Sequence, residues 1–174
     1  MRIIVIGQMG SGKSTLTRKI AQKCSVPRLE LDRLWFENGG HDCLVNGCTE
    51  EKKQQIKERT RKAVSDFLSE NEEWVVDGTH SKIQPLIAEK ADAVVLIQRP
   101  ILKRLLSHVV RVFKGKDRHP EVSWWKDLLH TKVIFDRWRQ NRHDTQMDAA
   151  AAYQDKLVVL SSFKEIDHYF NSLG

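Results

Sequence analysis

The feature that most constrains the fold is the sequence Gly-Gln-Met-Gly-Ser-Gly-Lys-Ser at residues 7–14. It satisfies the spacing G-x-x-x-x-G-K-S/T, in which glycines let the backbone curl so that successive N–H groups face phosphate oxygens. An apolar run at residues 3–6 precedes it, and a helical pattern at residues 16–21 follows it. This order predicts a phosphate-binding loop, or P-loop, between a strand and a helix. The alternative is a glycine-rich turn that binds no ligand.

The residue types within this loop predict individual contacts with ATP and Mg²⁺. Lys13 is expected to reach the β- and γ-phosphates and to act in catalysis, while Ser14 is expected to ligate Mg²⁺. A helix that begins near Lys13 adds the positive end of its dipole to the anion site. The expected nucleotide-binding residues are Gly7, Gly10, Ser11, Gly12, Lys13, Ser14 and Thr15, the last of these at the α-phosphate.

Nearly continuous apolar runs, rich in β-branched residues, recur at residues 3–6, 74–76, 93–97 and 157–160. Such runs are typical of strands that are buried on both faces of a sheet. A fifth run at residues 28–31 alternates polar and apolar residues, which suits a half-exposed edge strand. Helical patterns lie between the strands, so the chain is predicted to be α/β, with a parallel sheet, right-handed crossovers and helices on both faces. The predicted helices include residues 50–70, 101–113, 121–142 and 163–173.

The 174 residues suit a single domain, residues 1–174, without repeats or an inter-domain linker. No apolar run approaches the ~20 residues that would cross a bilayer, so no membrane partner is expected. The first residues resemble a strand rather than a signal peptide. A cytoplasmic location is therefore expected.

The three cysteines, Cys24, Cys43 and Cys48, are an odd and sparse set that implies no disulfide framework. His41, Cys43 and Cys48 offer three metal ligands, but no second ligand pair completes a tetrahedral site. Free thiols in a loop are the favoured interpretation.

Two aspartates follow predicted strands. Asp32 is expected to end the second strand, at the sheet edge where ligands of parallel sheets gather, and to receive the hydroxyl of an acceptor or hold its ring. Asp77 follows the run at residues 74–76 and is expected to act on the magnesium side, through a water. Alternatively, Asp32 caps a helical turn and Asp77 caps a loop.

A basic segment spans residues 99–142, with twelve Lys or Arg and four Asp or Glu residues, in a chain whose formal net charge is +6. Phosphoryl transfer needs positive side chains close to the transferring group, which would explain such a basic segment. Binding of a nucleic acid backbone would explain it equally well. Arg111, Arg118 and Arg137 are predicted to be catalytic, with Arg139 and Arg142 as further candidates; solvated surface charge is the alternative for each. Trp124, Trp125, Phe135 and Trp138 interleave with these charges, as in a stacking surface for single strands or in a packed helical face.

Together these motifs resemble the P-loop nucleotide and small-molecule kinases, the relatives of adenylate kinase and shikimate kinase. More narrowly, they are similar to bacterial DNA topology modulation proteins. The resemblance rests on residues 4–16, on L-D-x-L-x-F at 31–36, on W-V-V-D-G at 74–78, on A-D-A-V-V-L at 91–96 with Pro100 after it, and on V-V-L-S-S at 158–162.

This resemblance implies a three-layer sandwich with a five-stranded sheet of order 2-3-1-4-5 and a helical lid. It also implies an acceptor-side helical region at about 33–72 and a basic lid region at about 111–142. Two departures limit it. Relatives often have Leu-Asp where this chain has Ile97-Gln98, and residues 38–48 differ from the usual pattern, so no acceptor pocket is carried over.

The resulting hypothesis is a phosphotransferase that uses ATP and Mg²⁺ on a nucleotide or other small metabolite. The alternative is an ATP-binding regulatory protein associated with nucleic acid. Fold alone does not decide between them, and the sequence predicts no oligomeric state.

Overall fold

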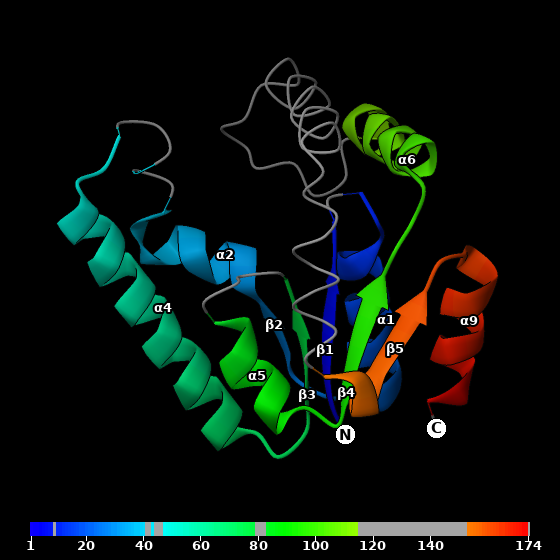
Figure 1. Ribbon diagram of the computed structural model, residues 1–174, viewed down its shortest axis with the longest axis horizontal. Coiled ribbons are helices and arrows are strands. Elements are labelled where there is room, and N and C mark those ends of the chain that lie inside the picture. Colours follow the sequence, from blue (N-terminus) through cyan, green and yellow to red (C-terminus); the bar gives the residue numbers. More distant parts are fainter. Residues whose placement is uncertain (9, 41–42, 44–46, 79–82, 115–152, 174) are drawn as a thin grey trace.

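A five-stranded parallel sheet forms the centre of the molecule (Figure 1). The computed structural model describes residues 1–8, 10–40, 43, 47–78, 83–114 and 153–173. The strands are β1 (Arg2–Gly7), β2 (Arg28–Glu30), β3 (Trp74–Asp77), β4 (Ala93–Ile97) and β5 (Leu157–Leu160), in the order β2-β3-β1-β4-β5. All four neighbouring pairs are parallel. The predicted fold class and strand order are confirmed.

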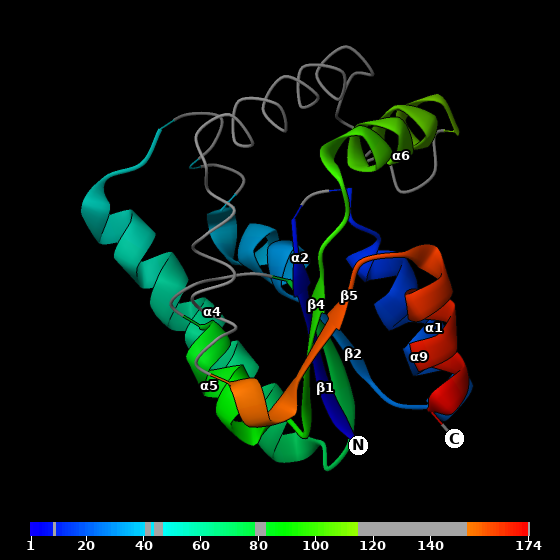
Figure 2. The same ribbon diagram turned by 45° about the vertical axis from the view of Figure 1, so that its right-hand side comes forward.

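Helices pack on both faces of this sheet (Figures 1 and 2). Along the chain the helices and helical turns are α1 (Lys13–Cys24), α2 (Leu31–Trp35) with the π-helical turn η1 (Phe36–Gly40), α4 (Glu50–Glu70), α5 (Gln84–Lys90), α6 (Ile101–Lys114), the 3₁₀ turn η2 (Gln154–Lys156) and α9 (Phe163–Ser172). Of these, α6 lies beyond the ends of the strands rather than on a face of the sheet (Figures 1 and 2). Within the described residues no helix is long and apolar enough to cross a lipid bilayer.

Two hydrophobic cores separate the layers, because side chains alternate along the buried strands. Ile4 and Ile6 of β1 point into the core that α4 and α5 cover. Ile3 and Val5 point into the core that α1 and α9 cover. The sheet is thus apolar on both faces, which is why its strands are nearly continuous apolar runs.

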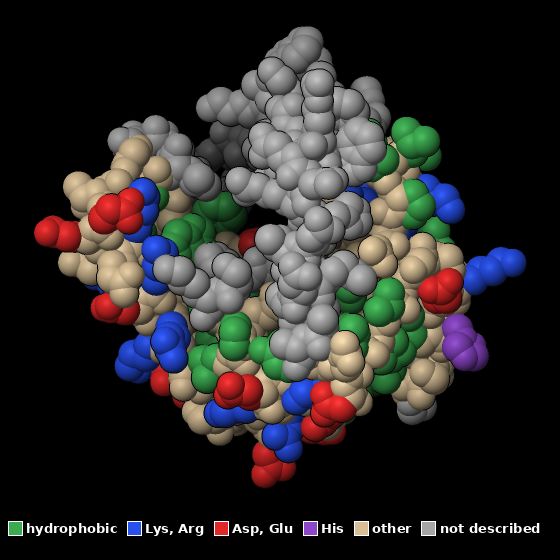
Figure 3. Space-filling model, viewed as in Figure 1, with side chains coloured by type: hydrophobic (Ala, Val, Ile, Leu, Met, Phe, Trp, Pro, Cys, Tyr) green, Lys and Arg blue, Asp and Glu red, His purple; other side chains and the backbone are tan. Residues whose placement is uncertain are grey.

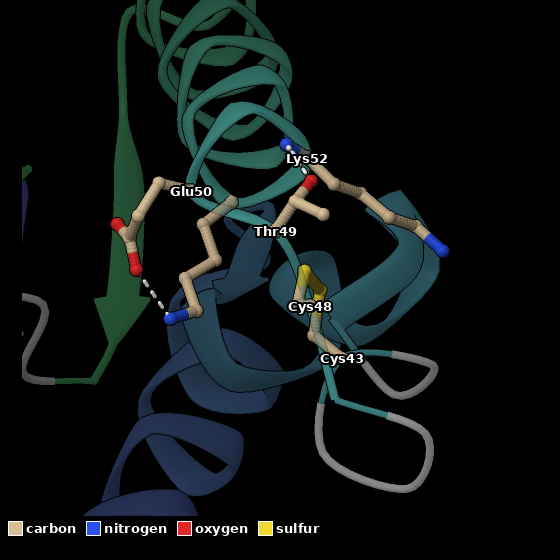
Figure 4. Close-up of a disulfide and its surroundings, with 6 residues drawn as sticks. Cys43, Cys48, Thr49, Glu50 and Lys52 are labelled. Atoms are coloured by element: carbon tan, nitrogen blue, oxygen red, sulfur yellow. Dashed lines mark hydrogen bonds and ion pairs between the residues drawn. A yellow bond between two sulfur atoms is a disulfide. The ribbon is translucent and has the colours of Figure 1, made fainter.

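The sequence also explains where the long helices begin. Thr49 caps α4, since its Oγ1 accepts a hydrogen bond of 3.3 Å from the backbone N–H of Lys52 (Figure 4). At the start of α9, Ser162 Oγ accepts from the backbone N–H of Glu165 at 3.2 Å, and the carboxylate of Glu165 accepts from Ser162 Oγ in return. The pKa of Glu165 is lowered, first because the backbone N–H of Ser161 also donates to it.

Two expectations from the sequence are wrong. β2 ends at Glu30 and α2 begins at Leu31, so Asp32 lies in the first turn of a helix rather than at the end of a strand. The strand is short because only Arg28 to Glu30 pair with β3, and Leu31 turns into the core, where it is fully buried.

The second correction concerns the cysteines. Cys43 and Cys48 form a disulfide in the loop before α4, with their Cα atoms 4.6 Å apart, so they are not free thiols (Figure 4). An odd total does not exclude one local pair, and Cys24 on α1 is the cysteine that remains free. The disulfide occupies two of the three side chains of the alternative metal site, whose third residue, His41, lies outside the described residues.

Candidate P-loop site

The P-loop connects the end of β1 to the start of α1, at the edge of the sheet where the strands end (Figure 1). Gly10 has a φ of 76°, in the left-handed region, and a Cβ there would lie 2.7 Å from the backbone carbonyl oxygen of Arg104. Only glycine allows this approach of α6 to the loop. Gly12 has a φ of 103°, and a Cβ at that position would meet no atom of the described residues within 4 Å. Among these residues, the loop is therefore packed at Gly10 and open at Gly12.

The polar groups of the loop are of the kind that binds phosphate. Ser11 is fully buried, yet its Oγ has no hydrogen-bond partner among the described residues. A buried hydroxyl without a partner is costly unless a ligand supplies one. Lys13 Nζ donates to the backbone carbonyl of Gln8 at 3.2 Å, so the ammonium folds back over the loop. Ser14 and Thr15, in the first turn of α1, are exposed.

Asp77 lies beside the loop because β3 is the parallel neighbour of β1, with Val5 as the register partner of Asp77. Its side chain is 7% exposed, and Oδ2 pairs with Nη2 of Arg28 at 3.3 Å. Ser14 hydroxyl and Asp77 carboxylate are hard oxygen ligands, the kind that Mg²⁺ prefers. Within the described residues no cluster of three or more His, Cys, Asp or Glu could hold a metal by itself. This donor set fits Mg²⁺, which usually keeps waters and phosphate oxygens as ligands.

The start of α2 contacts the end of β3, which brings the two predicted aspartates into neighbouring segments. Gly78 directly follows Asp77, and a Cβ on Gly78 would lie 2.9 Å from Cβ of Leu31. Asp32, the next residue after Leu31, is exposed. A surface cavity of about 420 Å³ lies between η1 and α4, with Asn38, Ile56 and Arg59 in its lining, within the range 33–72 that was predicted to be acceptor-side.

Of the predicted arginines, Arg111 alone belongs to an element that the structure describes. Arg111 falls within α6, but its side chain is outside what the structure describes. Arg118, Arg137, Arg139 and Arg142 lie outside the described residues, as do the four aromatic residues between them, most of the predicted lid and the whole of the predicted helix 121–142.

Two arginines that the sequence did not single out are buried, and one of them, Arg104, contacts the P-loop. Arg104 on α6 is 3% exposed, and its backbone touches the loop at Gly10. Arg99 is 5% exposed, and its guanidinium carbon lies 3.9 Å from the ring centroid of Phe163, as in a cation–π contact. Burial lowers the pKa of both arginines. One feature of the sequence weakly indicates the burial of Arg104. It follows Ile101 by three residues and therefore lies on the same side of the helix as that apolar residue.

A family model described as an AAA domain matches residues 3–104, which contain the loop and both aspartates. A search of curated proteins found no match.

Solved structures resemble the chain over nearly its whole length. The crystal structure of TT1252 from Thermus thermophilus has a TM-score of 0.61 and 16% sequence identity, covering 99% of this chain and 95% of that chain. Shikimate kinase from Bacteroides thetaiotaomicron has a TM-score of 0.58 and 17% identity, with the same coverage. A gluconokinase from Sinorhizobium meliloti 1021 has a TM-score of 0.55 and 19% identity, covering 98% and 97%.

At these identities the likeness shows the fold alone, and that fold is the P-loop kinase fold. The family match covers more than half of the chain and includes the complete phosphate-binding motif. The chain therefore belongs to the AAA domain family.

Proposed function

We propose that the protein is a phosphotransferase that uses ATP and Mg²⁺ to phosphorylate a small acceptor. The observation that carries this proposal is the P-loop itself. Among the described residues it is open at Gly12, and the buried hydroxyl of Ser11 has no hydrogen-bond partner. An anion with several acceptor oxygens would satisfy that hydroxyl together with the backbone N–H groups of the loop. The P-loop kinase fold of the structural neighbours supports the same reaction class.

In this proposal each side chain has one task. Lys13 leaves the carbonyl of Gln8 and donates to the β- and γ-phosphates, where its charge offsets that of the transferring group. Ser14 and Asp77 hold Mg²⁺, Asp77 through a water. Asp32 orients the acceptor hydroxyl and takes its proton. When bound, ATP supplies the phosphoryl group and Mg²⁺ neutralises charge on its oxygens.

Arg111, Arg118 and Arg137 remain predicted phosphate ligands in a proposed lid at residues 111–142. We also propose a cytoplasmic location. The alternative, a regulatory protein of the DNA topology modulation type, depends on the same basic segment. On the face shown in Figure 3, Lys and Arg side chains over α4 are mixed with Asp and Glu, so this described part of the surface is no uniform basic patch.

An acceptor-dependent ADP-release assay tests the proposal. The acceptors are nucleoside monophosphates, nucleosides and small hydroxylated acids, beginning with shikimate and gluconate, since two structural neighbours are kinases of those names. We expect at least one acceptor to raise ADP release above the no-acceptor control. Tight, salt-sensitive DNA binding without acceptor-dependent ADP release would support the regulatory alternative instead.

Variants of the two aspartates test the magnesium role and the acceptor role separately. Asp77→Asn should weaken the dependence on Mg²⁺, and Asp32→Asn should impair acceptor use while ATP binding stays nearly intact. Equal loss of ATP binding in both folded variants would contradict this division of roles.

A further inference from the structure

Arg28 is buried at a place where an edge strand would normally expose a charge. It is the first residue of β2, an outer strand, yet only 14% of its side chain is exposed. Its guanidinium contacts three elements. Nε donates to Thr17 Oγ1 on α1 at 2.9 Å. Nη1 pairs with Glu30 Oε1 at 2.7 Å, and Nη2 pairs with Asp77 Oδ2 at 3.3 Å.

The contact with Thr17 extends this network to the P-loop. Thr17 Oγ1 accepts from Arg28 and donates to the backbone carbonyl of Ser14 at 3.3 Å. Thr17 is fully buried, so bulk water does not compete for these bonds. One hydrogen-bonded path therefore joins the backbone carbonyl of Ser14, through the Thr17 hydroxyl and the Arg28 guanidinium, to the Asp77 carboxylate. Its two ends are the residues to which the magnesium side of the site has been assigned.

The positive charge of Arg28 also stabilises two neighbouring carboxylates. Glu30 and Asp77 are register partners on neighbouring strands, which brings two carboxylates to the same edge of the sheet. The guanidinium pairs with both, and so offsets their mutual repulsion. A planar guanidinium can donate in three fixed directions at once, whereas a lysine ammonium is a compact charge that cannot reproduce that fork.

We infer that Arg28 is a positioning residue for magnesium: it holds Ser14 and Asp77 in fixed relation, so that Mg²⁺ tightens nucleotide binding. This inference rests on the proposed function, because it assumes that Ser14 and Asp77 act on the metal. Groups behind a metal site commonly change metal affinity by tenfold or more when they are lost.

The test compares nucleotide affinity with and without metal, by calorimetry with an ATP analogue whose γ-phosphate cannot be transferred. In the wild type, Mg²⁺ should tighten binding. Arg28→Lys should keep the metal-free affinity and lose about tenfold of the gain from Mg²⁺. Thr17→Val removes the hydroxyl between Arg28 and Ser14 but keeps the pair with Asp77, and it should lower the gain in the same direction. Thermal unfolding checks that each variant folds, and if Arg28→Lys does not fold, Thr17→Val decides.

Arg33→Lys is the matched control, because Arg33 also pairs with a carboxylate, that of Glu37 at 2.8 Å, but is exposed. It should bind like the wild type. A full magnesium gain in Arg28→Lys or, where that variant is unfolded, in Thr17→Val would overturn the inference, and so would an equal loss with and without metal. If Asp77→Asn loses the gain and Arg28→Lys does not, only the role of Arg28 is wrong. If the wild type itself gains nothing from Mg²⁺, the proposed function fails, and the inference with it.

Discussion

Gly10 and Gly47 form a natural pair for measuring what the contact between the P-loop and α6 contributes. Their φ angles are 76° and 74°, but a Cβ at Gly47 would meet no atom of the described residues within 4 Å, whereas at Gly10 it would meet the carbonyl of Arg104. Either substitution by alanine should cost about 1–2 kcal/mol for the left-handed backbone. Gly10→Ala should cost more in urea unfolding and also weaken ATP binding. Equal losses of unfolding free energy in the two variants would mean that α6 moves away from the added methyl group without a loss of stability.

Lys13 is the residue whose loss should affect nucleotide binding most directly. Lys13→Ala removes a charge-assisted hydrogen bond to phosphate, worth roughly 1.5–3 kcal/mol. ATP affinity in a calorimetric titration should therefore fall at least about tenfold. Lys19→Ala is the control, since Lys19 is on the same helix but is exposed and lies 4.0 Å from Asp167. An unchanged titration for Lys13→Ala would show that the loop is not the nucleotide site.

Tyr169 on α9 should make stability depend on alkaline pH. Burial raises its pKa to about 12, from an ordinary value of 10.0. The folded chain therefore holds the phenol neutral where the unfolded chain ionises it, so the stabilisation is complete below pH 10 and is lost as the pH rises towards about 12. Urea unfolding at a series of pH values measures this loss. Tyr169→Phe should show a smaller loss, and an identical pH dependence would contradict the assignment.

At the scale of elements, the Cys43–Cys48 disulfide constrains the loop that leads into α4. Because the two cysteines are only 5 residues apart in sequence, the closed loop is short, and reduction should lower the free energy of unfolding by no more than about 2 kcal/mol. Denaturant unfolding with and without a thiol reductant measures the change. The double variant Cys43→Ser/Cys48→Ser should not respond to reductant. A response of equal size there would assign the effect to something other than this bond.

The elements also show why the sequence predicted the strands better than their ends. A buried strand such as β4 is visible as an apolar run, whatever lies beside it. The boundary at Asp32 depends instead on how many residues of β2 pair with β3, which is a tertiary property. The disulfide likewise depends on the path of a loop, which spacing alone does not specify.

For the whole molecule, alternating strands and helices predicted a parallel α/β sheet, and the glycine-rich motif predicted the position of the P-loop. The order of the strands came from the resemblance to P-loop kinases. The partners of charged side chains were not predictable. Arg28 belongs to an alternating strand and Arg104 to a basic helix, and both patterns normally indicate solvated charge. Arg28 is buried because three elements meet around it, and Arg104 is buried where α6 crosses the P-loop.

The two outer strands of the sheet differ in their protection against association with other chains. β2 is three residues long and carries Arg28 and Glu30, features that discourage pairing with a foreign strand. β5, Leu157–Leu160, is uncharged and apolar, with two β-branched valines at its centre, and Val159 is 41% exposed. If heating loosens the last elements of the chain, β5 is the segment from which aggregates should grow. Val159→Lys should delay turbidity on heating without lowering the unfolding midpoint. A variant that clouds as early as the wild type would place the nucleus of aggregation elsewhere.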